Sequence, residues 1–162
     1  MPRYDVKKGK SLNLRERVDK DTDIEITLAA SARADVKITA DACAAQHIKV
    51  RVKVRHDGSD SRSAIALAAA AQDKAKIEFK VELETAPKIK NATATQRARI
   101  MLLSPNAQGK IEPLQTVASE GIKASHGAAV YGADPAELFY LATRGIPDAS
   151  AKKLLKDALL AL

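Results

Sequence analysis

The chain has 162 residues, with 27 Lys and Arg against 20 Asp and Glu, one Cys, no Trp and only five Phe and Tyr. This length fits one domain that buries its own core, and the lone Cys43 excludes a secreted scaffold held by internal disulfides. No apolar run approaches the roughly 20 residues that span a bilayer, and the first residues are polar, so we expect a cytoplasmic protein with no membrane partner.

The positive charge does not by itself indicate nucleic-acid binding. Residues 1–60 hold 13 basic and 10 acidic groups, and residues 61–162 hold 14 and 10, so the excess is even along the chain. Single-stranded nucleic acids stack their bases on aromatic side chains, and these are scarce here. We therefore expect no nucleic-acid partner.

After a polar N-terminal segment, residues 1–22, the sequence alternates between apolar and polar residues. Such a period of two predicts β-strands with one buried and one wet face. It is clearest in four runs, at 24–28, 36–38, 48–54 and 77–83. Further strands are predicted at 97–103, 114–118 and 122–125.

The Ala-rich segment 63–71 is ambiguous. Alanine favours a helix, but Ile65 and Leu67 alternate with small residues and strands flank the segment on both sides. We interpret it as a strand built from small residues.

Regularly spaced short strands are typical of a β-sandwich, a barrel or a β-solenoid. The sequence has no Asn-Gly and one Asp-Gly, at Asp57-Gly58, whereas a sandwich needs many tight turns. With 31 Ala and few aromatics, the core must consist of small and branched side chains. These features favour a β-solenoid, or β-helix, over residues 23–131, in which each coil buries its inward residues against the next.

Residues 132–162 change period and predict two helices. Asp134 is suited to the N-cap, Pro135 to the first helical position and Gly145 to the stop. A second helix begins near Asp148 or Ser150 and carries an apolar stripe. The fold class is thus mainly β with a C-terminal two-helix tail.

Cys43, His47 and His56 are the residues that a metal site would use. A structural zinc site needs four ligands with paired close spacings, and those are missing. We favour a small Cys and two turn or surface histidines, and keep Cys43 as a weak metal-ligand candidate.

Four cations alternate along one predicted strand, at Lys49, Arg51, Lys53 and Arg55. They could bind a polyanion or an acidic partner, but such a row more often pairs with acids on neighbouring strands. Glu25, Glu78 and Glu82 are available for this pairing. The sequence contains no phosphate loop, nucleophile elbow or acid–aromatic groove for sugars, so we expect a protein that is not an enzyme.

Several spaced motifs resemble the SufBD family, the scaffold subunits of the SUF iron–sulfur cluster assembly machinery. The run 124–130 reads Ala-Ser-His-Gly-Ala-Ala-Val, 138–141 reads Leu-Phe-Tyr-Leu and 144–147 reads Arg-Gly-Ile-Pro. They are similar to the family's Cys-Ser-His-Gly-Ala-Thr, Leu-Phe-Tyr-Leu and Arg-Gly-Ile motifs. Residues 95–104 resemble its Gln-x-x-x-x-Leu-Leu-Leu-Ser strand.

The resemblance implies a right-handed parallel β-helix, a SufD-like scaffold role and cytoplasmic partners. The partners would be a SufC-like ABC ATPase and a SufB-like subunit or a second copy of this chain. His126 matches the family histidine near the nascent cluster, whereas the preceding family Cys is Ala124 here and Cys43 lies outside the matching motifs. A transient Fe–S cluster would therefore share its ligands with a partner, and we expect none bound to the isolated chain.

The same resemblance assigns the ATPase-docking surface to the two helices. The residues expected to bind this partner are Leu138, Phe139, Tyr140, Arg144, Ile146, Leu154 and Leu155. The alternative function is a β-solenoid interaction or dimerisation module that binds the ATPase without handling a cluster.

Overall fold

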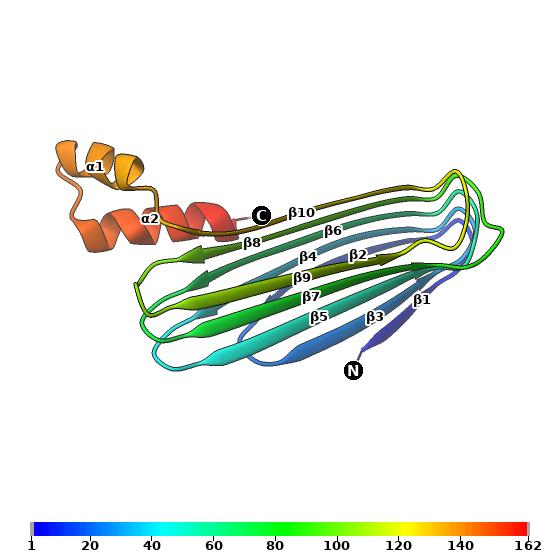
Figure 1. The fold of residues 1–162 in the computed structure, drawn as a ribbon, viewed down its shortest axis with the longest axis horizontal. Helices are drawn as coiled ribbons and strands as arrows, with labels where there is room; N and C mark the ends of the chain where they lie inside the picture. Colours follow the sequence, from blue (N-terminus) through cyan, green and yellow to red (C-terminus); the bar gives the residue numbers. More distant parts are fainter. Residues whose placement is uncertain (1, 162) are drawn as a thin grey trace.

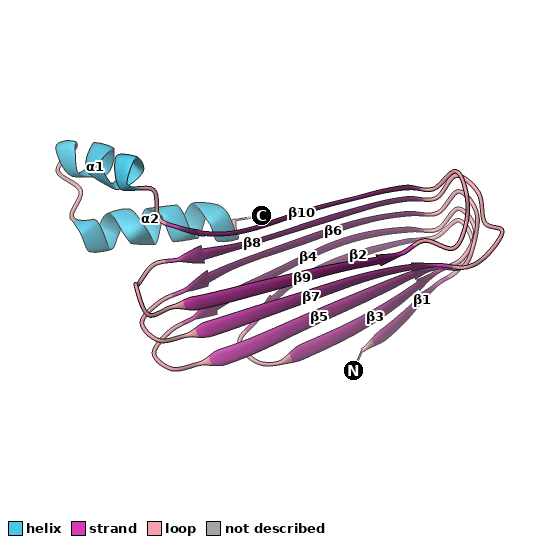
Figure 2. Ribbon diagram, in the orientation of Figure 1, coloured by secondary structure: helices cyan, strands magenta, loops and turns pink. Residues whose placement is uncertain are grey.

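The computed structural model, which describes residues 2–161, is a parallel β-solenoid followed by two helices (Figure 1). Successive strands alternate between two facing sheets, and neighbours within each sheet run parallel and in register (Figure 2). Sheet A contains β1 (Arg3–Val6), β3 (Thr22–Leu28), β5 (His47–His56), β7 (Lys76–Thr85) and β9 (Gln108–Thr116). Sheet B contains β2 (Ser11–Val18), β4 (Arg33–Ala42), β6 (Arg62–Ala71), β8 (Thr93–Leu102) and β10 (Lys123–Gly132). The predicted β-solenoid is confirmed.

Because apolar and polar residues alternate along the strands, the apolar side chains of both sheets point inward and form the core between them. Inward residues of both sheets form one buried cluster of Val, Ile, Leu and Ala around a single large aromatic, Phe79. Each inward side chain packs on the residue in register on the next coil, as in Val36, Ile65 and Gln96 of three adjacent strands. A solenoid core is therefore thin and needs few bulky residues.

The solenoid begins earlier than the alternation indicated. Strands β1 and β2 lie within residues 1–22, where a polar segment was expected. Arg3 pairs with Glu25 and Lys76 with Gln108, so the coil lengthens from 22 residues at the N-terminal end to 32 near the C-terminal end. The strands of the first coil, β1 and β2, are the edge strands of the two sheets and pack against a neighbouring coil on one side only. Their residues therefore need less apolar character than those of the central coils.

The last coil is longer than predicted. Strand β9 begins at Gln108 and β10 extends to Gly132, although both contain residues with poor strand propensity. Pro113 is tolerated because β9 is an edge strand. Gly109 is required by packing, since a Cβ there would lie 2.9 Å from side-chain atoms of both Ile100 and Val130.

Two helices follow the solenoid, α1 (Pro135–Thr143) and α2 (Asp148–Leu160). The predicted cap is confirmed, because Asp134 accepts a hydrogen bond from the Ala136 N–H at 2.8 Å. Helix α2 packs on the outer face of sheet B through Leu159, which is buried against Ala68 and Ala70 of β6. Those outward alanines are small because a helix covers them.

Candidate functional site

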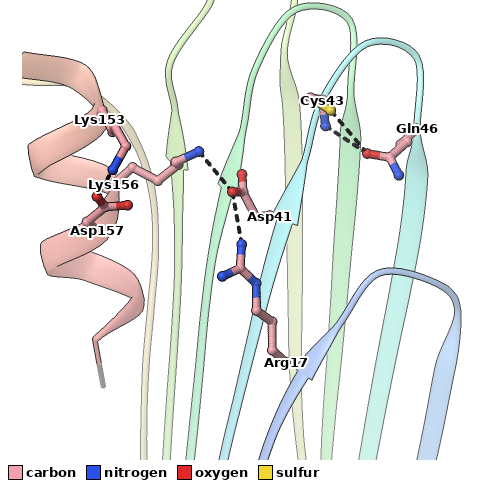
Figure 3. A network of polar contacts seen from close by, with 7 residues as sticks. All are labelled: Arg17, Asp41, Cys43, Gln46, Lys153, Lys156 and Asp157. Carbon is pink, nitrogen blue, oxygen red and sulfur yellow. Dashed lines mark hydrogen bonds and ion pairs between the residues drawn. The ribbon is translucent and has the colours of Figure 1, made fainter. Parts of the chain in front are cut away.

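The structure separates the three residues that a metal site would use. Cys43 is exposed in the turn after β4, where its Sγ lies 3.6 Å from the Gln46 Oε1 (Figure 3). His47 Nε2 lies 3.0 Å from Glu78 Oε1 on the neighbouring strand. Among residues 2–161 no group of three His, Cys, Asp or Glu side chains is arranged to hold a metal ion.

His56 is buried in a hydrogen-bonded chain at the turn between β5 and β6. Its Nδ1 is 2.7 Å from Ser61 Oγ, and Ser61 in turn donates to the Gly58 carbonyl at 2.6 Å. Because that donation uses the Ser61 proton, Nδ1–H must donate and Nε2 must accept from Ser63 Oγ, 2.9 Å away. Burial lowers the His56 pKa to about 4. This neutral imidazole secures the turn.

Two of the four cations on β5 pair with acids of the adjacent strand β7, and Arg55 pairs with Asp57 in the following turn, in line with the more conservative interpretation. Arg51 forms two hydrogen bonds of 3.0 Å with Glu82, and Lys53 lies 2.8 Å from Glu84. The hydrogen bond from Arg51 holds the pKa of the Glu82 carboxyl below its usual range. The row forms an ion-pair lattice on the outer face of sheet A.

The C-terminal end of the solenoid is open within the described chain. Strands β9 and β10 are the outer edges of the two sheets, and no further coil or helix of residues 2–161 covers them. The side chain of Val130 faces the interior beside Gly109 but is 42% exposed. Leu114, on the outer face of the edge strand β9, is 48% exposed. Unpaired strand edges next to apolar side chains favour addition of another chain.

Three polar residues lie at this open end. His126 belongs to the same inward-facing set of β10 as Val130, and it is in register with Gln96 on β8. Gln96 is 3% exposed; its Oε1 accepts a 3.2 Å hydrogen bond from Gln115 Nε2, and its own Nε2 is buried without a partner in the described chain. We call His126, Gln96 and Gln115 the mouth.

Within residues 2–161, the mouth combines an exposed imidazole without a hydrogen-bond partner with an amide donor that lacks an acceptor. Buried polar groups are normally paired, so the Gln96 amide marks a place where an additional acceptor fits. Iron–sulfur clusters in proteins are usually held by four Cys, or by Cys with His. Ala124 leaves the mouth without a thiolate, so His126 is the one residue there that can ligate iron.

Helix α2 is fastened to sheet B by charge as well as by apolar packing. Asp41 Oδ2 on β4 lies 2.8 Å from Lys156 Nζ and 3.2 Å from an Arg17 guanidinium nitrogen on β2 (Figure 3). Both Asp41 and Lys156 have side chains less than one-fifth exposed. Such partly buried pairs fix the helix more firmly than surface pairs do.

The predicted docking residues divide into two groups. Phe139, Tyr140 and Leu154 are exposed by 73%, 56% and 50%, and the Arg144 guanidinium lies 5.3 Å from the centre of the Tyr140 ring. The remaining residues, Leu138, Ile146 and Leu155, are half-buried, and Leu155 packs on the cluster beneath α2.

Helix α1 buries no side chain, and the element it contacts most is α2. It therefore presents an apolar surface beside the solenoid. Sequence reasoning missed Gln96 and Gln115 because a polar residue on the inward set of a strand is visible only once the strand's register is known. The one available signal was Gln96 within the motif at 95–104.

No helix among residues 2–161 combines the length and apolar character needed to cross a membrane.

A protein-family model described as "SUF system FeS cluster assembly, SufBD core domain" matches residues 15–159. The chain is 38% identical over 64 residues to the iron–sulfur cluster assembly protein SufD of Bacillus subtilis, covering 40% of this chain and 15% of that protein. It is 37% identical over 65 residues to an iron–sulfur cluster assembly SufBD family protein of Synechocystis, covering 40% and 14%. The aligned part is thus about one-seventh of these relatives.

Proposed function

The chain belongs to the SufBD family of the SUF iron–sulfur cluster assembly system, and on this premise we propose that it is a non-catalytic, SufD-like scaffold subunit. It would work with a SufC-like ABC ATPase and with a SufB-like subunit or a second copy of itself. The observation that carries the proposal is the mouth, where His126 is in register with Gln96, whose buried Nε2 has no partner among residues 2–161.

The chemistry of the mouth supports a shared site for the cluster under assembly. One imidazole supplies one ligand, and a cluster requires several thiolate or imidazole ligands. The rest must come from a partner that covers the same open end. The cluster is then cargo held between two subunits, with no resident cofactor in this chain.

Pairing through the open end is supported by the difference between the two ends of the solenoid. At the N-terminal end β1 has only four residues, and Glu16 is a charged residue in the inward set of the edge strand β2. Short edge strands and inward charges discourage strand addition. At the C-terminal end the edge strands are long and bear Val130 and Ile111 on the interior side. We therefore place the subunit interface at β9 and β10.

Light scattering after size exclusion tests the interface. We expect the chain to form a dimer, alone or with a SufB-like subunit, and Val130→Asp to abolish it because a carboxylate would be buried in an apolar contact. Asn13→Asp adds the same charge on the opposite edge strand and should leave the dimer intact. A Val130→Asp protein that dimerises like the wild type, or a wild type that pairs with neither subunit, contradicts the proposal.

Anaerobic reconstitution in the presence of the SufB-like subunit tests ligation. We expect His126→Ala to lower the iron and sulfide retained and to change the visible absorption of the complex. His47→Ala is the matched control, since His47 is exposed on sheet A and pairs with Glu78. Equal iron and sulfide in wild type and His126→Ala would remove His126 from the site.

The helical tail supports the second part of the proposal, ATPase docking. Exposed Phe139, Tyr140 and Leu154 form an apolar surface of the kind that marks a protein interface. Phe139→Ser should abolish co-purification with a SufC-like ATPase while leaving the free energy of unfolding unchanged. Loss of folding in this variant, or undiminished co-purification, would contradict the role of the surface.

The alternative function is an interaction module that binds the ATPase but never holds a cluster. Ala124 at the position of the family Cys favours it. Under this alternative Phe139→Ser loses the ATPase, but His126→Ala leaves iron retention unchanged. The two experiments together separate the two functions.

A further inference from the structure

The net positive charge of the protein is concentrated on one face. Outward positions of the strands in sheet A carry eight Lys and Arg against seven Asp and Glu. Outward positions in sheet B also carry eight Lys and Arg, two each on β2, β4 and β8 and one each on β6 and β10, but only two acids. The outer face of sheet B therefore holds an excess of six positive charges, whereas that of sheet A holds an excess of one.

The cations of sheet B line an open depression with a floor of small residues. Arg97 of β8 is in register with Ala66 of β6 and with Gly127 of β10, and Ala66 is in register with Lys37 of β4. Together with Arg99 these residues border a depression of about 590 Å³. Among residues 2–161, Lys37, Arg97 and Arg99 form no ion pair, in contrast to Arg51, Lys53 and Arg55 of β5.

The depression continues the seat of the protein's own helix. Helix α2 begins beside the turn at Gln72 and Asp73 and runs back along β6, so that Leu159 in its last turn covers Ala68. The next outward residues of the same strand, Ala66 and Ala64, are not covered. One half of the alanine track on β6 thus seats a helix, and the other half is open.

We propose that this open half, which we call the basic track (Lys37, Ala64, Ala66, Arg97 and Arg99), binds an acidic amphipathic helix of a partner protein. The seat of α2 shows that alanines on β6 accommodate a helix with Leu side chains facing the sheet. In that seat the sheet supplies the acid, Asp41, and the helix supplies the base, Lys156. In the basic track the sheet supplies the bases instead. A helix that binds there must therefore carry Asp and Glu beside its apolar stripe.

The track fits a helix better than nucleic acid. Its lining residues are Ala, Gly, Leu, Arg and Lys, and none of them has an aromatic ring on which an unpaired base could stack. It is also separate from the mouth, because its residues point outward from sheet B while His126 belongs to the inward set. The inference is therefore independent of the proposed cluster site.

Fluorescence anisotropy with a synthetic peptide tests the basic track. The probe is a capped helix of about five turns, roughly 18 residues, with Leu and Ala on one face and Glu on the other. We expect saturable binding to the wild type and roughly tenfold weaker binding to Arg97→Glu/Arg99→Glu, since two attractions become repulsions. Lys49→Glu/Lys74→Glu changes the net charge equally at exposed sites outside sheet B and should bind like the wild type.

Each other result contradicts the proposal. A wild type without saturable binding, or equal affinity of both double variants, shows that the track is not the site. A matched peptide with Gln in place of Glu that binds as tightly excludes recognition of the acidic face. A duplex DNA of similar length that displaces the peptide and binds more tightly assigns the face to nucleic acid instead. Circular dichroism of both variants verifies that they are folded.

Discussion

Acidification should destabilise the protein by protonating a buried imidazole, that of His56, in addition to its paired carboxylates. In the folded state its imidazole is fully buried, and burial lowers its pKa to about 4. In the unfolded chain the pKa is about 6.5. Between these two values the unfolded state binds a proton that the folded state does not, so the free energy of unfolding falls as the pH falls.

The size of the effect follows from the difference between the two pKa values. Each pKa unit corresponds to about 1.4 kcal/mol, so His56 should cost about 3 kcal/mol of stability between pH 6.5 and about pH 4. Above pH 6.5 the imidazole is neutral in both states, and its stabilising contribution is complete. Below about pH 4 it is charged in both states, and no further loss arises from this residue.

Urea denaturation followed by circular dichroism measures the effect at pH 7, 6, 5 and about 4. The reference is His56→Leu, which fills a similar volume and does not titrate. His56→Leu leaves Ser61 and Ser63 without their partner and is less stable at pH 7, so the quantity of interest is the difference between the two proteins at each pH. The carboxylates, among them Glu82 with its lowered pKa, titrate in both proteins. Subtraction therefore cancels their contribution to the pH dependence of stability.

We expect the advantage of the wild type to shrink by about 3 kcal/mol from pH 7 to about pH 4. His56→Gln, which retains a hydrogen-bonding side chain, should show the same flat reference behaviour. A wild-type advantage that stays constant over this range would falsify the assignment of His56 as a buried neutral imidazole.

Three further predictions concern packing and the mouth. Asp41→Ala removes both ion pairs of the α2 seat and should lower the free energy of unfolding by about 1 kcal/mol and speed amide exchange in α2; unchanged exchange would show that apolar contacts alone hold the helix. Gln96→Leu removes a buried side chain whose Nε2 has no partner among residues 2–161, together with the hydrogen bond from Gln115 to its Oε1; it should raise stability by about 1 kcal/mol while weakening iron retention, whereas a loss of stability would indicate that the amide nitrogen is satisfied. Gly109→Ala, whose Cβ would meet two side chains at 2.9 Å, should cost about 1–2 kcal/mol in thermal denaturation. Gly127→Ala, with no atom within 4 Å, is the matched neutral control, and equal melting temperatures for the two variants would contradict the packing argument.

The sequence predicted the central coils because their local pattern and their environment agree. From Ile48 to Val54 in β5 and from Ile77 to Leu83 in β7, every second residue is a large apolar side chain that is buried, so the period of two is unbroken there. The Ala-rich β6 shows the same agreement in a weaker form, since its inward positions include Ile65 and Leu67. Where a strand has a neighbouring coil on each side and buries one face, the alternation of apolar and polar residues is enough to predict the strand and its buried face.

The end coils were underestimated for the opposite reason. Strands β2 and β10 each have a neighbouring coil on one side only, so their inward residues include polar or small side chains such as Glu16 and Ala128. Their strand conformation comes from pairing with β4 and β8, which no local property of the sequence reports. The same limit hid the mouth, because Gln96 and His126 are 30 positions apart and meet only through the register of β8 and β10.

The charge distribution is the property for which the expectation from the sequence differs most from the structure. Each coil contributes one strand to each sheet, so any long stretch of sequence samples both faces equally and the basic excess looks uniform. In the folded solenoid the cations of β5 lie beside the acids of β7, and their charges cancel in pairs. On sheet B the strand between Lys37 of β4 and Arg97 of β8 carries Ala66 at the corresponding position, and the two outward acids of the sheet leave most of its positive charge uncompensated. A protein without a basic segment thus acquires a basic face from strand order alone, and that face provides a binding surface separate from the mouth.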